Sequence, residues 1–212
     1  MIDTVIFDFD GTLADTTQLV INSFKHIYYK YYNKCDEEYI RGTFGEPLEV
    51  TLKRDFSNFK YEEVLASYRD YQVDKFEKDV KLYDTVEETL YYLKNNNFKL
   101  GIATSRVRAS TLWALKNFKI DKYFEVVVAA DDVIKHKPDK EPLIKVIEGL
   151  NSKTESTLYV GDSKYDMECA INAQTTPVLA GWHSNSKILA EKYNVKHVID
   201  KMWDLIHIIN EK

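Results

Sequence analysis

Two aspartates near the N-terminus have the type and spacing to act together in chemistry. Asp8 and Asp10 stand two positions apart, at the end of the apolar residues Val5, Ile6 and Phe7. A short and almost continuous apolar run is typical of a strand buried on both faces of a parallel sheet. Because positions i and i+2 of a strand point to the same face, the two carboxylates are expected to converge where the strand ends. The sequence therefore predicts a compact acidic site.

Gly11 and Thr12, which follow the second aspartate, add groups suited to an anion. Gly11 gives the backbone the freedom for a sharp turn, and Thr12 places a hydroxyl beside exposed amides. Carboxylates repel a phosphate, so a site that holds both needs a divalent cation, and Mg²⁺ prefers oxygen ligands. Asp8 or Asp10 can then attack phosphorus while the other handles protons.

Two other interpretations of this stretch are open. Asp10 and Gly11 form a common pair in hairpin turns between two strands. A calcium-binding loop that started at Asp8 would need its final glutamate where the chain has Leu19, which disfavours that alternative.

Polar side chains also follow the later strands that the sequence predicts. A strand over residues 98–104 ends in Thr104, Ser105 and Arg106, which offer hydroxyls and the start of a helix, both suited to a phosphate oxygen. After the next strand, Lys137 can place a positive charge against a phosphate and an attacking carboxylate.

A further pair of carboxylates, Asp162 and Asp166, follows the strand expected over residues 157–160 and suits a metal ion. Each fragment alone is a weak signal. Together with the first acidic turn they occur in order, each at the carboxyl end of a strand, where the ligand site of an open parallel sheet lies. The combination favours one site over a set of unrelated surface residues.

The chain after residue 81 alternates strands with helices. Strands are expected over residues 98–104, 125–130, 157–160, 177–179 and 197–199, with helices over 112–118, 143–150 and 166–173 and one at the C-terminus. Asp84 followed by Glu87 predicts a capped helix start. This alternation indicates an α/β fold with a doubly wound, mainly parallel sheet.

Residues 15–80 show helical spacing and no convincing strand. This segment follows directly after the acidic turn in the chain, so it is expected to emerge beside the site. A helical unit there can act as a lid over the site. We expect a core domain of residues 1–14 and 81–212 and a helical cap domain of residues 15–80. A loop over residues 41–47 supplies Gly45 and Arg41 as candidate substrate-binding residues. For Arg41, as for Lys53 and Arg54, a solvated surface charge is the favoured interpretation.

Composition narrows the possible partners. The chain has 212 residues and a formal net charge of −5, with acidic and basic residues interspersed, which gives no electrostatic footprint for nucleic acid or a membrane surface. It has no signal peptide and no stretch long enough to span a membrane, so a cytoplasmic protein is expected. Cys35 and Cys169 are too few and too far apart for a disulfide framework and are interpreted as ordinary thiols.

These residues resemble the haloacid dehalogenase superfamily. Its signature is an Asp-x-Asp-Gly-Thr strand end, a Thr or Ser after the second strand, a distant Lys and a final Gly-Asp-x-x-x-Asp, and all four are present. The resemblance covers essentially the whole chain, including the inserted cap, and implies a Rossmann-like core. Within the superfamily, residues 44–48, residues 131–138 and the pair Gly181-Trp182 look most like the branch of phosphoglycolate phosphatases and a bacterial inorganic pyrophosphatase.

The resemblance implies a role for each residue. Asp8 would be the nucleophile that becomes an aspartyl phosphate, and Asp10 the general acid and base. Thr104 would bind the phosphoryl group and Lys137 would neutralise charge. The metal set that the resemblance implies for Mg²⁺ is Asp8, Asp162, the backbone carbonyl of Asp10 and, supporting the shell, Asp166. Gly11, Thr12, Ser105 and Arg106 would line the substrate site.

The reaction expected on these grounds is hydrolysis of a small phosphate ester, phosphoglycolate first. Pyrophosphate is the second candidate substrate, and a phosphomutase of the β-phosphoglucomutase type is a different reaction built from the same residues. Glu46, an acidic residue expected to face the site, counts against a highly anionic substrate. A phosphoacceptor signalling domain would have neither the cap nor Asp10. A small-molecule substrate and a monomer or homodimer are expected.

Overall fold

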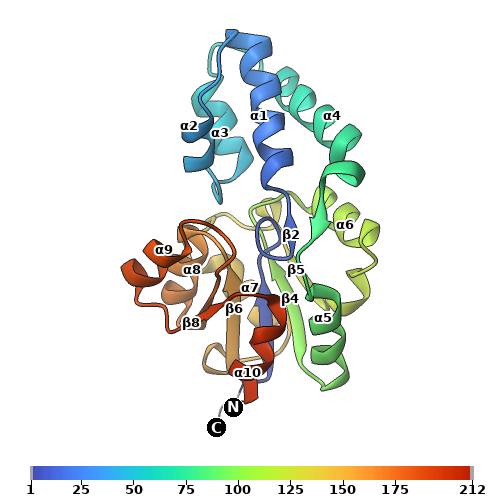
Figure 1. Ribbon diagram of the computed structural model, residues 1–212, viewed down its shortest axis with the longest axis vertical. Coiled ribbons are helices and arrows are strands. Elements are labelled where there is room, and N and C mark those ends of the chain that lie inside the picture. The colour runs from blue at the N-terminus through green and yellow to red at the C-terminus, as the bar shows by residue number, and fades with distance from the viewer. Residues whose placement is uncertain (1, 211–212) are drawn as a thin grey trace.

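The apolar run at the N-terminus forms a central strand in the computed structural model, which describes residues 2–210 (Figure 1). Six strands of the described chain pair in the order β5-β4-β1-β6-β7-β8, and all of the pairs are parallel. They are β1 (Thr4–Phe7), β4 (Lys99–Ala103), β5 (Val126–Val128), β6 (Thr157–Gly161), β7 (Thr176–Ala180) and β8 (His197–Ile199). The mainly parallel sheet predicted from the sequence is confirmed.

Successive residues of β1 are buried against two different helical layers. Val5 and Phe7 share a hydrophobic cluster with residues of α5 (Val86–Asn95), α6 (Arg108–Asn117) and α10 (Leu205–Asn210). Ile6 belongs to a second cluster with residues of α7 (Glu141–Gly149) and α8 (Lys164–Ala173). Leu189 of α9 (Ser186–Tyr193) packs beside α8 and β7. Because helices cover both faces of the sheet, the sequence of β1 is almost continuously apolar, as in other doubly wound folds.

Four helices stand apart from the sheet, above it in Figure 1. They are α1 (Thr17–Tyr32), α2 (Glu37–Gly42), α3 (Leu48–Asp55) and α4 (Tyr61–Asp79). They bury a hydrophobic cluster of their own, in which Phe24, Phe56 and Tyr68 are among the largest side chains. We therefore propose the division expected from the sequence, a cap of residues 15–80 on a core of residues 1–14 and 81–212.

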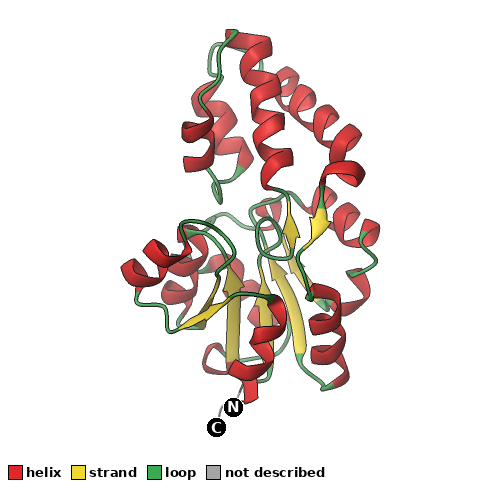
Figure 2. Ribbon diagram, viewed as in Figure 1, coloured by secondary structure: helices red, strands yellow, loops and turns green. Residues whose placement is uncertain are grey.

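A two-stranded antiparallel ribbon joins these two parts, shown in yellow between cap and sheet in Figure 2. It pairs β2 (Ala14–Asp15) with β3 (Lys81–Leu82). The sequence did not predict this ribbon, because strands of two residues are too short for a periodic pattern. The ribbon brings the two crossings between cap and core side by side. Short 3₁₀ turns at Asp121–Tyr123, Ala130–Asp132, Thr154–Ser156 and Met202–Asp204 complete the connections in the described chain.

The start of α5 differs from the expected capping box. Thr85 occupies the N-cap position with φ +64°, and neither it nor Asp84 accepts a capping hydrogen bond from the helix. The Thr85 hydroxyl instead accepts the amide hydrogen of Trp203 at 3.0 Å. A contact to the C-terminal segment thus takes the place of the local cap that the sequence pattern predicted.

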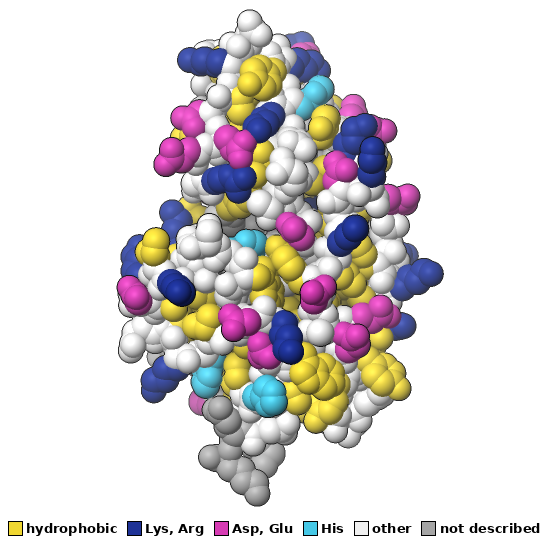
Figure 3. All heavy atoms as spheres, in the orientation of Figure 1, with side chains coloured by type: hydrophobic (Ala, Val, Ile, Leu, Met, Phe, Trp, Pro, Cys, Tyr) yellow, Lys and Arg dark blue, Asp and Glu magenta, His cyan; other side chains and the backbone are white. Residues whose placement is uncertain are grey.

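The molecular surface carries charges of both signs. Acidic and basic side chains are interspersed over the face shown in Figure 3. Among the described helices, none combines the length and the apolar character needed to cross a membrane.

Candidate active site

The acidic turn begins where β1 leaves the sheet. Asp8 extends the pairing by one residue, since its amide donates to the Val160 carbonyl at 2.9 Å. The carbonyl of Phe9 then accepts amide hydrogens from the following residues and closes a tight turn. The neighbours of β1 are the parallel strands β4 and β6. Asp10 and Gly11 therefore do not form the turn of a hairpin with β1, and that alternative is wrong.

Gly11 lies at the closest approach of the turn to a second loop. Its φ is +79°, and a Cβ at this position would lie 2.5 Å from Oδ2 of Asp162. Both facts require glycine. Thr12 donates its hydroxyl to the other oxygen of Asp162 at 3.1 Å. The carbonyl of Gly11 is held at 2.8 Å by Nε1 of Trp182 and by Nε2 of His183. The turn is thus fixed from two sides.

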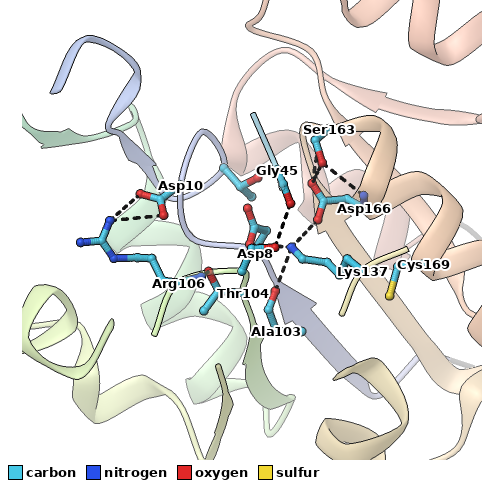
Figure 4. Close-up of polar contacts among 12 residues, drawn as sticks. Asp8, Asp10, Gly45, Ala103, Thr104, Arg106, Lys137, Ser163, Asp166 and Cys169 are labelled. Carbon is cyan, nitrogen blue, oxygen red and sulfur yellow. Dashed lines mark hydrogen bonds and ion pairs between the residues drawn. The ribbon is translucent and has the colours of Figure 1, made fainter. Parts of the chain in front are cut away.

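Lys137 is the only lysine buried in this site within residues 2–210, with its side chain 2% exposed. Its ammonium lies 2.9 Å from Oδ1 of Asp8 and 2.6 Å from Oδ1 of Asp166 (Figure 4). It also contacts the Tyr159 hydroxyl at 3.1 Å. Burial alone would lower the pKa of Lys137, but the carboxylates of Asp166 and Asp8 outweigh it and raise the pKa. Lys137 is therefore a fixed cation.

Asp166 uses both carboxylate oxygens inside the protein. Oδ1 accepts from Lys137 and from Tyr159 at 2.8 Å, while Oδ2 accepts from the amide of Ser163 at 3.0 Å and from its hydroxyl at 2.6 Å. Burial acts to raise the pKa of Asp166, but Lys137 and these hydrogen bonds hold it below its usual range. With its lone pairs occupied, Asp166 orients Lys137 and the Ser163 loop and is poorly placed as a direct metal ligand.

The contacts of Asp8 and Asp162 do not offset burial in the same way. Burial, together with the charges of Asp166 and Asp162, raises the pKa of Asp8 despite its contact with Lys137. Burial and the charge of Asp166 raise the pKa of Asp162 to about 8. Carboxylate oxygens of Asp8, Asp162 and Asp166 lie within 4.8 Å of one another. This surplus of negative charge and oxygen donors fits a divalent cation held chiefly by Asp8 and Asp162.

Asp10 lies outside this group of carboxylates and faces another partner. Figure 4 shows its carboxylate directed toward Arg106. Nη1 of Arg106 donates to its two oxygens at 2.9 and 3.3 Å. A contact of the Asp10 backbone carbonyl with a metal, which the family resemblance implies, stays a prediction. The assignment of Asp10 as acid and base also stays a prediction.

The end of β4 supplies the hydroxyls expected there and meets the cap. Thr104 is buried, and its hydroxyl oxygen accepts the Arg106 amide hydrogen at 3.2 Å. The hydroxyl of Ser105 donates to the carbonyl of Gly45 at 2.9 Å. A Cβ on Gly45, whose φ is +86°, would lie 2.7 Å from the Tyr165 ring and 2.8 Å from the Ser163 hydroxyl. The cap loop therefore lies directly against the core loops that surround the acidic turn.

The charged cap residues are engaged within the cap. Arg41 donates to Glu37 at 2.7 Å, so the structure does not bring its guanidinium to the acidic turn, and its substrate role stays a prediction. The Glu46 carboxylate, expected to face the site, accepts from Thr51 at 2.7 Å and from Arg54 at 3.0 Å, both on α3, and its orientation toward the site stays a prediction. The ion pair with Arg54 offsets the repulsion between the Glu46 carboxylate and an anionic substrate.

Several residues of the site escaped the sequence analysis. Tyr159 lies within an apolar strand and reads as a core residue, yet its hydroxyl binds Asp166 and the Ala103 carbonyl. Tyr68 has helical spacing and reads as a packing residue of the cap. Burial raises its pKa, and the charges that act on it are those of Arg106 and Asp10, which places it on the side of the cap that faces the site. No sequence pattern distinguishes either tyrosine from its neighbours.

Comparison with known proteins agrees with this geometry. A sequence profile of the haloacid dehalogenase-like hydrolases matches residues 5–180. The chain belongs to this family. A protein from Caldanaerobacter subterraneus, provisionally named pyrophosphatase PpaX, is 40% identical over 98% of this chain and 94% of its own length. Pyrophosphatase PpaX from Bacillus mycoides is 39% identical over 99% of this chain and 97% of its own length.

A solved structure agrees with the fold of this haloacid dehalogenase-like hydrolase. The structure, provisionally described as a family member from Bacteroides fragilis, superimposes with a TM-score of 0.86 at 25% identity, covering 97% of this chain and all of the other. The resemblance noted in the sequence is confirmed, and the chain is a phosphohydrolase of the haloacid dehalogenase family.

Proposed function

We propose that this protein is a Mg²⁺-dependent phosphohydrolase of a small phosphate compound, with pyrophosphate as the first substrate to test. The observation that carries the proposal is the buried array at the end of β1, in which Lys137 bridges Asp8 and Asp166 at 2.9 and 2.6 Å. A carboxylate oriented by a fixed cation, beside a surplus of negative charge, suits attack on a phosphoryl group.

The first half of the reaction uses Asp8 as the nucleophile. One carboxylate oxygen of Asp8 bonds to phosphorus, the bond from phosphorus to the leaving oxygen breaks, and an aspartyl phosphate results. Lys137 orients Asp8 through Oδ1 and offsets charge on the transferring group. Thr104, whose hydroxyl oxygen already accepts from the Arg106 amide, has its hydroxyl hydrogen left to donate to a phosphoryl oxygen.

Asp10 serves as the proton carrier in both halves. It protonates the leaving oxygen as the first bond breaks and then takes a proton from the water that attacks phosphorus. The water oxygen joins phosphorus, the bond to Asp8 breaks, and Asp8 is regenerated. One carboxylate suffices because Asp10, once it has protonated the leaving group, is the base that takes a proton from the attacking water, which restores its starting state.

The metal site in this proposal consists of Asp8, Asp162 and the backbone carbonyl of Asp10, with Asp166 in support. When bound, Mg²⁺ would offset the repulsion between these carboxylates and the phosphate and stabilise charge on the phosphoryl oxygens. Thr12 and the Gly11 carbonyl contacts keep Asp162 and the turn in place for it.

One observation supports pyrophosphate ahead of phosphoglycolate, and another supports a small substrate of either kind. The relatives that match nearly the whole chain are named pyrophosphatases. The cap loop contacts the core directly through Ser105 and Gly45, which favours a small leaving group. Phosphoglycolate stays the second candidate, since it has a similar size and a second anionic group.

The test is phosphate release from pyrophosphate, phosphoglycolate, sugar phosphates and nucleotides, each with Mg²⁺ and with chelator. We expect pyrophosphate to have the highest kcat/KM and all release to stop in chelator. Transfer of the phosphoryl group to an added sugar phosphate, without release of phosphate, would instead indicate a phosphomutase. Equal release from every substrate would contradict specificity imposed by the cap.

A further inference from the structure

The ion pair between Arg106 and Asp10 is enclosed by aromatic rings. The guanidinium carbon lies 5.6 Å from the ring centre of Phe9 and 6.0 Å from that of Phe76. Phe9 belongs to the acidic turn, whereas Phe76 lies in the last turns of cap helix α4 and meets Trp113 of α6 edge to face, with the ring centres 4.7 Å apart. The Arg106 side chain is 10% exposed and that of Asp10 is 30% exposed. Arg106 thus lies at the junction of cap and core.

The Arg106 guanidinium uses only part of its hydrogen-bonding capacity. Within residues 2–210, its hydrogen bonds come from Nη1 alone, and both go to Asp10. Nε is buried without any hydrogen-bond partner in this part of the chain. A buried donor left unpaired costs free energy, so such groups usually have a partner in some state of the protein. Arg106 therefore has unused capacity for an anion beside the site.

The same pair conflicts with the proposed role of Asp10. A proton carrier must reach the leaving oxygen of a phosphate attacked by Asp8. In Figure 4 the Asp10 carboxylate is directed toward Arg106, while Asp8 is engaged with Lys137. Asp10 has to leave Arg106, or share it, before it can act.

We propose that Arg106 recognises the second anionic group of the substrate, and that this group displaces Asp10 from Arg106 and so frees Asp10 to act as proton carrier. This inference rests on the proposed function and specifies its substrate class: a phosphoryl group joined to a leaving group that is itself an anion, as in pyrophosphate. Arginine suits this exchange because its planar fork binds carboxylate and phosphate oxygens alike. A substrate with a neutral leaving group would leave the ion pair in place.

The test compares two probes by titration calorimetry in Mg²⁺. Imidodiphosphate, which resembles pyrophosphate but resists hydrolysis, has a second anionic group, whereas orthophosphate has none. We expect Arg106→Met to weaken imidodiphosphate binding by about 10- to 100-fold, the loss of a charge-assisted contact, with little change for orthophosphate. Arg69→Met, the same substitution at an exposed position of α4, is the matched control and should change neither affinity.

A second variant tests the exchange itself. Asp10→Asn removes the competitor for Arg106, so it should strengthen imidodiphosphate binding more than orthophosphate binding. In the double variant with Arg106→Met this selective gain should vanish. If circular dichroism shows that Arg106→Met is misfolded, the single Asp10→Asn variant, which keeps Arg106, decides the case.

Equal weakening of both probes by Arg106→Met in a folded protein would overturn the proposal, as would an Asp10→Asn variant with no selective gain. These binding results do not depend on turnover. Selective binding through Arg106 without pyrophosphate hydrolysis would refute the proposed function alone, whereas hydrolysis without selectivity would refute the exchange alone.

Discussion

Lys137 is the cation between two buried carboxylates of the site. Removing one partner of a buried ion pair leaves an uncompensated charge, which costs about 3–5 kcal/mol. We expect Lys137→Met to lower the free energy of unfolding by roughly this amount and to abolish turnover. Urea denaturation measures the stability. Lys135→Met, at a side chain 71% exposed, is the control and should leave stability unchanged.

Asp162 makes the metal-free protein sensitive to pH. Its pKa is raised from 3.8 to about 8 in the fold, so the folded state binds more protons than the unfolded state between these values. Stability therefore falls as pH rises through this window. In chelator, thermal unfolding should show a Tm that decreases between pH 5 and pH 8, by roughly several degrees.

Saturating Mg²⁺ should remove this pH dependence, because a bound cation takes the place of the proton. Asp162→Asn should remove most of it even in chelator. A Tm in chelator that rose steadily over the same pH range would show that the site carries no surplus of negative charge.

Residue types and spacing in the sequence were enough to predict that Asp8, Thr104, Lys137 and Asp162 would lie together, since each follows a strand of one parallel sheet. The partner of each residue was not predictable. The Asp166 oxygens accept from Lys137, Tyr159 and Ser163, and Asp10 pairs with Arg106. These contacts depend on the directions of side chains on strands far apart in the chain.

At the scale of the elements, the Gly45 loop of the proposed cap packs against the core. We expect Gly45→Ala to reduce kcat/KM by about 10- to 100-fold, because a Cβ would push the loop away from Ser163 and Tyr165 and misplace the cap. Its positive φ adds strain of ~1–2 kcal/mol. Gly42→Ala is the matched control, since a Cβ there meets nothing within 4 Å. Steady-state kinetics on both variants would contradict this account if they gave equal activity.

The strands and helices of the core were predictable because their apolar periods are set by burial on a sheet. The elements that were missed are those without such a period. The β2–β3 ribbon is too short, while α2 has only Ile40 buried and α9 only Ser186 and Leu189. The predicted cap at Asp84 failed because a long-range contact from Trp203 to Thr85 determines the start of α5.

At the scale of the whole molecule, the proposed site lies where the proposed cap meets the core. Asp8, Lys137 and Asp162 come from the core, while the Gly45 loop and the Tyr68 face of α4 come from the cap. The two crossings are held together by the β2–β3 ribbon next to the acidic turn. In the proposed function, the cap selects the leaving group while the core carries out phosphoryl transfer.

The central claim is that Asp8 accepts the phosphoryl group, and trapping that intermediate tests it most directly. The enzyme is mixed with pyrophosphate and Mg²⁺, quenched in acid during turnover, and digested for mass spectrometry. We predict one added phosphoryl group on the peptide that contains Asp8, absent in chelator and in a folded, inactive Asp8→Asn variant. Undiminished pyrophosphate hydrolysis by Asp8→Asn, or a phosphoryl group on another residue, would contradict the account.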